Sequence, residues 1–153
     1  MSHFQFTPDG KQLVIGTEKG VLRVMDVANR KVTRSIDLDS PVKSLAASAE
    51  KIAVGYSDGS VAILNFGDQS SVREVRKQNG SIDALAFSQK GDLFASGSAD
   101  HTVEVWDAKA RKPLCSLQGH GAAVVAVVFI ADGQTMASMD ADGVVNIWIP
   151  PKR

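Results

Sequence analysis

The stretch GSADHTVEVWD, residues 97–107, decides the fold because it recurs along the chain. It begins with a polar turn, continues with alternating apolar and polar residues, and ends on Trp106-Asp107. Alternation of this kind predicts a half-buried β-strand. The stretch ASMDADGVVNIWI, residues 137–149, repeats the pattern and places Trp148 at 42 residues from Trp106. The chain is therefore read first as an array of repeats of about forty residues.

Two weaker copies precede these two. They are VIGTEKGVLRVMD at residues 14–26 and AVGYSDGSVAILN at residues 53–65, with Met25 and Leu64 at the tryptophan position. The strands in each copy are rich in Val, Ile and Ala, and turns such as TPDGK and SQKGD separate them. No stretch combines a helical period with helix caps. A repeat of this length with about four strands predicts a β-propeller blade, and hence an all-β fold.

The pattern Gly-His … Asp … Trp-Asp resembles the WD-repeat family. Gly119-His120 and Trp148 carry it in the last repeat, and Trp106-Asp107 carries it in the third. The resemblance implies one propeller segment spanning residues 1–153. Its four blades are expected at about residues 1–37, 41–77, 81–118 and 123–149, the last without its outer strand.

The resemblance also implies a hydrogen-bonded chain of four side chains inside a blade. A tryptophan N–H is only a donor, so a buried one needs an acceptor, which a serine hydroxyl can supply. We interpret the chain as a structural staple and expect no catalytic residue in it. The expected members are His120, Ser138, Asp142 and Trp148 in the fourth blade, and Gln78, Ser96, Asp100 and Trp106 in the third.

Four blades leave the closure of the ring open. Propellers have about 4–8 blades, and WD-repeat rings resemble the larger sizes. Three interpretations follow. The chain is part of a longer propeller, or two copies complete an eight-bladed ring, or it is a closed four-bladed ring or an engineered fragment. Uncovered strand edges and blade faces favour further pairing.

Composition limits the possible chemistry. Seventeen basic residues balance seventeen acidic ones, which argues against nucleic-acid and membrane partners. The single cysteine, Cys115, excludes an intrachain disulfide and favours a reducing compartment, cytoplasmic or nuclear. No two of the three histidines lie at metal-ligand spacing, and we expect neither a metal nor a cofactor. The apolar run at residues 122–131 is too short to cross a bilayer as a helix, so we expect a strand buried on both faces.

The leading functional hypothesis is a non-catalytic scaffold that binds proteins or peptides. Alternatives are a self-assembling half-ring whose main partner is a second copy, or a propeller that binds a small ligand or acts as an enzyme. The family resemblance implies contact positions in the loops near the histidine and aspartate of each blade. Lys43 and Asp83 carry opposite charges on adjacent blades. The full set is Lys43, Ser57, Ser81, Asp83, Ala99, Ala123, Val125 and Ala141.

Overall fold

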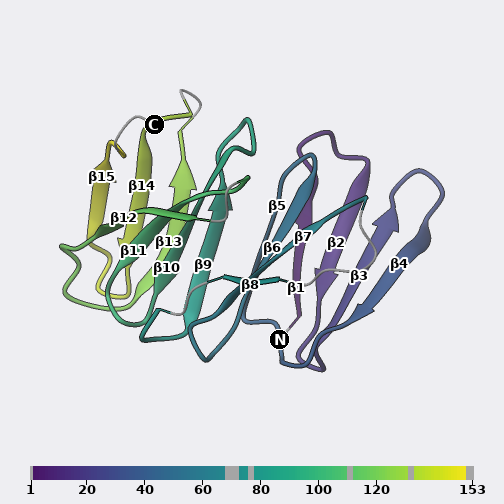
Figure 1. The fold of residues 1–153 in the computed structure, drawn as a ribbon, viewed down its shortest axis with the longest axis horizontal. Helices are drawn as coiled ribbons and strands as arrows, with labels where there is room; N and C mark the ends of the chain where they lie inside the picture. The colour runs from purple at the N-terminus through teal and green to yellow at the C-terminus, as the bar shows by residue number, and fades with distance from the viewer. Residues whose placement is uncertain (1, 68–72, 76–77, 110–111, 131–132, 151–153) are drawn as a thin grey trace.

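A computed structural model describes residues 2–67, 73–75, 78–109, 112–130 and 133–150. Within these residues the chain forms fifteen strands in four antiparallel sheets, and no helix. The predicted all-β fold class is confirmed. Figure 1 shows the sheets following one another in chain order, with the first and the last at opposite ends of the array.

Each sheet is one blade, and its strands pair in chain order. Blade 1 contains β1 (His3–Phe6), β2 (Gln12–Gly16), β3 (Val21–Asp26) and β4 (Lys31–Asp37). Blade 2 contains β5 (Ser44–Ala47), β6 (Lys51–Gly55), β7 (Val61–Asn65) and β8 (Arg73–Val75). Blade 3 contains β9 (Ile82–Phe87), β10 (Leu93–Ser98), β11 (Val103–Asp107) and β12 (Lys112–Leu117). Blade 4 contains β13 (Val124–Phe129), β14 (Met136–Asp140) and β15 (Val145–Trp148).

Tight turns join the strands within a blade. The TPDG turn between β1 and β2 closes with a 3.1 Å hydrogen bond from the Gln12 N–H to the Thr7 hydroxyl and a 3.0 Å bond from the Lys11 N–H to Asp9. Gly10 has a φ of +69° in this turn, a conformation that L-amino acids rarely adopt. The turn sequence therefore sets the pairing of the two strands.

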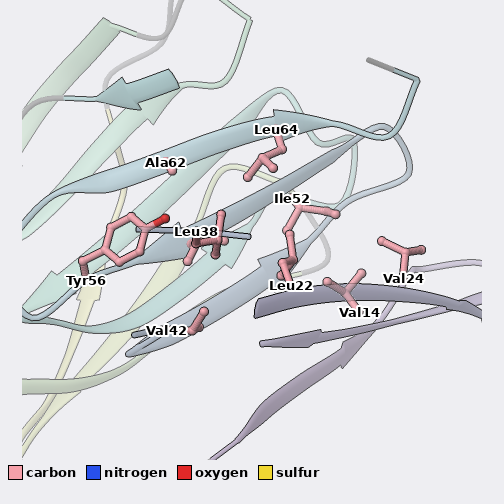
Figure 2. Packing of buried hydrophobic residues seen from close by; sticks show 10 residues of the cluster. Val14, Leu22, Val24, Leu38, Val42, Ile52, Tyr56, Ala62 and Leu64 are labelled. Carbon is pink, nitrogen blue, oxygen red and sulfur yellow. The ribbon is translucent and has the colours of Figure 1, made fainter. Parts of the chain in front are cut away.

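Blades pack face to face, and every blade has two faces. We call the face toward the next blade in the chain the leading face, and the opposite one the trailing face. Val14, Leu22 and Val24 on the leading face of blade 1 are almost fully buried, and they pack with Ile52 and Leu64 on the trailing face of blade 2 (Figure 2). These interfaces between blades hold the hydrophobic core.

A glycine lets the inner edges of neighbouring blades approach closely. A Cβ added to Gly16 would lie 2.7 Å from Val42 Cγ1, and one added to Gly97 would lie 2.6 Å from Val124 Cγ1. Both distances are too short for real atoms, so the next blade fills the place of the missing side chain. The repeat places Met139 at the equivalent position of blade 4.

The expectation that residues 122–131 are buried on both faces is wrong. Strand β13 buries Val124 completely, but 41 % of Val125 and 55 % of Val128 are exposed. The physical reason is that only one face of β13 meets another blade. The trailing face of blade 4 packs on blade 3, whereas no blade in the described part of the chain covers its leading face.

Candidate functional site

A chain of side-chain hydrogen bonds runs through blade 4. The Trp148 indole donates to Ser138 Oγ over 2.7 Å. The same hydroxyl lies 2.6 Å from His120 Nε2, and His120 Nδ1 lies 2.9 Å from Asp140 Oδ2. With the hydroxyl accepting from the indole and donating to Nε2, the Nδ1–H of His120 donates to Asp140. His120, Ser138 and Asp140 are all buried.

The acidic member of this chain is Asp140, and the expectation of Asp142 is wrong. Asp142 is exposed in the turn, and its backbone N–H donates to Asp140 Oδ1 over 3.0 Å. Asp140 Oδ1 also accepts the Val144 N–H over 3.0 Å. The hydrogen bond from His120 holds the pKa of the Asp140 carboxyl below its usual value. Asp140 is the acid that reaches the imidazole because it still belongs to strand β14, whereas Asp142 has already left the sheet.

Blade 3 uses a different chain to reach its acid. The Trp106 indole donates to Ser96 over 3.0 Å, and Ser96 donates to Gln78 Oε1 over 2.5 Å. Gln78 Nε2 donates to Thr102 over 3.0 Å, and Thr102 donates to Asp100 over 2.5 Å. All four expected residues are present, but Thr102 joins them as a fifth member that sequence reasoning missed. The amide replaces the imidazole, and the threonine hydroxyl spans the remaining gap.

Hydrogen bonding also controls the charge of Asp100. Burial by itself would raise the pKa of this carboxyl, but hydrogen bonds from Thr102 and from the Asn79 N–H lower it below the usual value. The two chains therefore tie the β10–β11 and β14–β15 turns to the start of the inner strands. Within each chain, the side chains bond to one another.

The predicted contact positions lie in the loops at the strand ends. Lys43 Nζ lies 3.9 Å from Asp83 Oδ1, so the two predicted charges form an ion pair across blades 2 and 3. The Lys43 side chain is 49 % exposed and that of Asp83 is 22 % exposed. Ser81 donates a 2.8 Å hydrogen bond to the same Asp83 oxygen.

The other predicted contact positions are small or apolar. Ser57, Val125 and Ala141 are exposed, whereas Ala99 and Ala123 are half-buried. The backbone brings pairs of them together, because the Ala99 N–H donates to the Ser81 carbonyl and the Ala141 N–H to the Ala123 carbonyl, each over 2.9 Å. Of these smaller residues, Ser81 contacts the ion pair directly, through its hydrogen bond to Asp83.

An open hollow lies at the opposite ends of the strands from Lys43 and Asp83, and sequence reasoning missed it. It is open, has a volume of about 410 Å³, and is lined by Ala49, Glu50, Lys51, Asn65, Phe66 and Gly67. The signal in the sequence is the turn that begins at Ser48, which is two residues shorter than the equivalent turn of blade 3. The lining has no convergent set of catalytic groups.

Residues typical of metal or thiol chemistry do not gather in the described part of the chain. There, no three His, Cys, Asp or Glu side chains could hold a metal ion together. Cys115 is half-buried on the outer strand β12, and burial raises the pKa of its thiol. No helix among the described residues is long and apolar enough to span a bilayer.

Comparisons with known proteins follow the same repeats. The family model described as the Vps8 beta-propeller matches residues 40–149. The chain belongs to the WD-repeat β-propeller family.

This WD-repeat chain is 29 % identical to rat apoptotic protease-activating factor 1, over 77 % of the chain and 10 % of the rat protein. It is 27 % identical to the chicken U3 small nucleolar RNA-associated protein 15 homolog, over 76 % of the chain and 23 % of that protein. It is 34 % identical to the Arabidopsis thaliana protein SPA1-RELATED 4, over 71 % of the chain and 14 % of that protein. The WD-repeat chain thus spans less than a quarter of the length of these relatives.

Solved structures share the arrangement of blades. A chain of the mitotic checkpoint complex superposes with a TM-score of 0.86 and 21 % identity, and U3-55K with 0.88 and 20 %. The WD-repeat chain covers 48 % of each of these two chains. The computationally designed Ika4 protein superposes with a TM-score of 0.84 and 27 % identity, and there the coverage is 99 % of this chain and 93 % of Ika4.

Proposed function

We propose that this chain is a non-catalytic scaffold that binds protein or peptide partners through the loops around Lys43 and Asp83. The observation that supports this proposal is the 3.9 Å ion pair between two blades, in which the lysine is half-exposed and the aspartate also accepts a hydrogen bond from Ser81. Loops on a rigid framework are common binding sites in proteins. Membership of the WD-repeat family supports the scaffold role over an enzyme that uses its own side chains.

The partner should interact with both charges at once. A peptide that presents an acidic group to Lys43 and a basic group or a backbone N–H to Asp83 would take over the existing ion pair. The contact set contains no Trp, Tyr or Arg, the residue types that most often dominate binding energy. We therefore expect weak binding of an extended segment, in a reducing compartment such as the cytoplasm or the nucleus.

The test is to select short peptides from a random displayed library on the wild-type chain, and then to measure their affinity for charge-reversed variants. Lys43→Glu and Asp83→Lys should each lose binding of the selected peptides. Lys112→Glu reverses an exposed lysine on the outer strand β12 and serves as the matched control. All three variants should unfold at nearly the wild-type temperature, because exposed ion pairs contribute only about 0–1 kcal/mol.

Equal binding by the two loop variants and the control would place the peptide site elsewhere on the chain. Loss of binding in Lys112→Glu alone would place it on the outer edge of blade 3. A library that yields no enriched peptide would contradict the proposed peptide-binding role.

A further inference from the structure

Exposed apolar side chains gather at the two ends of the array of blades. In the described part of the chain, every large hydrophobic side chain that is strongly exposed belongs to blade 1 or blade 4, and none belongs to blade 2 or 3. A monomeric protein rarely leaves a large contiguous apolar patch open to water. The side chains are Phe4, Phe6, Val27 and Val32 in blade 1, and Val125, Val128, Ile130, Met139, Val144, Val145, Ile147 and Ile149 in blade 4.

The leading face of blade 4 carries the apolar positions of an internal interface on its three strands, and no blade among the described residues covers it. Ala137, Val145 and Ile147 take the positions that Ala95, Val103 and Val105 take in blade 3, according to the repeat. The three blade 3 residues are fully buried under blade 4, whereas Val145 is 56 % exposed and Ile147 is 60 % exposed. Cross-strand pairing arranges the face in two rows, one of Val128, Ala137 and Ile147 and one of Ala126, Met139 and Val145.

The trailing face of blade 1 is the matching half. Leu13 and Met25 are paired across β2 and β3, as Ile52 and Leu64 are paired across β6 and β7 in blade 2. Ile52 and Leu64 are buried under blade 1, but Leu13 and Met25 remain partly exposed. Two phenylalanines of β1 extend this trailing face across the neighbouring strand. Phe6 pairs with Leu13 and is 47 % exposed, and Phe4 pairs with Ile15 and is 68 % exposed.

We propose that a second copy of this chain covers both faces. The leading face of blade 4 in each copy packs on the trailing face of blade 1 in the other copy. The result is a closed ring of eight blades with a two-fold axis. Closed two-fold symmetry is the commonest form of homo-oligomer, and eight blades lie within the range of known propellers.

The internal interfaces favour a second copy as the occupant. Each internal interface joins a leading face to a trailing face. The two open faces are the leading face of blade 4 and the trailing face of blade 1, so they can pair in the same way. Two copies would also supply almost the length of a chain such as U3-55K, of which this chain covers 48 %. The match to Ika4, a chain of nearly equal length, supports a unit of this size.

Met139 requires the inner edge of the closing interface to differ from those of the internal interfaces. At Gly16 and Gly97 the next blade contributes the valine that fills the inner edge. At the equivalent position of blade 4, Met139 contributes apolar volume from the blade itself, and it is 38 % exposed. The proposal does not depend on the Lys43 and Asp83 loops, so it can fail without affecting the proposed peptide site.

The test is the mass of the purified chain in solution, measured by light scattering during size-exclusion chromatography. The expected mass is twice the 16.2 kDa of a single chain. Phe4→Lys on blade 1 and Ile147→Glu on blade 4 should each reduce it to that of one chain, because each charge would be buried in both interfaces of the ring. Ser116→Lys and Ser116→Glu, on the exposed outer strand β12, are the matched controls and should keep the double mass. Circular dichroism should show wild-type strand content for every variant.

Mixing the two disrupted variants makes the test directional. A pair of Phe4→Lys and Ile147→Glu has one interface with two wild-type faces and one with opposite charges, so the mixture should recover the double mass. If blade 1 instead packed on blade 1, Ile147→Glu alone would remain a dimer. A wild-type chain that stays at the single mass, a variant that stays at the double mass, a mixture without recovery, or assemblies larger than two copies would each overturn the two-copy ring.

Discussion

At the scale of single residues, blades 3 and 4 differ in how their hydrogen-bonded side chains reach an aspartate. Blade 4 joins His120 directly to Asp140 over 2.9 Å. Blade 3 has glutamine at the histidine position, so it needs Thr102 to reach Asp100. Both solutions satisfy buried donors and acceptors, which is the condition under which polar groups stabilise the interior of a sheet.

Asp140→Asn should lower the unfolding temperature, whereas Asp142→Asn should leave it almost unchanged. The first substitution removes the carboxylate that accepts from His120, and the second alters an exposed side chain. Thermal unfolding at neutral pH measures both. Equal effects of the two substitutions would contradict the assignment of Asp140 as the buried acid.

The same carboxylate predicts a dependence of stability on pH. Folding lowers the pKa of Asp140, so its contribution is fully present above the pKa of an unfolded aspartate, about 3.9, and is lost as the pH falls through the lower folded value. The difference in unfolding temperature between the wild type and Asp140→Asn should therefore shrink in acid. A difference that stays constant down to strong acid would contradict this linkage.

His120→Ala should destabilise the fold by roughly 1–3 kcal/mol, because it leaves buried hydrogen-bonding groups without a partner. Ser138 and Asp140 are the groups concerned. Urea unfolding followed by circular dichroism measures the free energy. An unchanged free energy would show that the hydrogen-bonded chain does not stabilise blade 4.

At the scale of elements, the contacts between blades depend on a glycine at the inner edge. Gly16 and Gly97 sit where the following blade inserts a valine. The pairing of β10 with β9 shifts its register next to Gly97, so the strand bends at this point. The close approach of neighbouring blades therefore depends on glycines that lack a side chain as much as on the hydrophobic side chains between the blades.

Gly97→Ala should destabilise the fold by about 1–3 kcal/mol through overpacking against Val124. Gly121→Ala is the matched control, since a Cβ there would have no atom within 4 Å. Urea unfolding of both variants gives the comparison. A loss of stability in Gly121→Ala equal to that in Gly97→Ala would show that the effect does not come from contact between the blades.

At the scale of the whole molecule, the proposed ring links folding to association. Burial of apolar faces by a second copy would stabilise the folded chain more as the concentration rises. The unfolding temperature of the wild type should increase with protein concentration, and that of Ile147→Glu should not. A wild-type temperature independent of concentration would contradict stabilisation by a second copy.

The repeat in the sequence was sufficient to predict an all-β fold with four blades, because strand alternation and turn glycines act over a few neighbouring residues. It also pointed to Trp106, Ser96, Trp148 and Ser138, whose mutual bonds lie within one blade. Other features were decided only by the tertiary structure. Asp140 meets His120 because β14 pairs with β13, and His120 lies just before β13 in the chain. Lys43 meets Asp83 because two blades pack side by side. One face of β13 is exposed because no blade among the described residues packs against it. Burial of a strand depends on a neighbouring blade and not on the strand's own apolar residues.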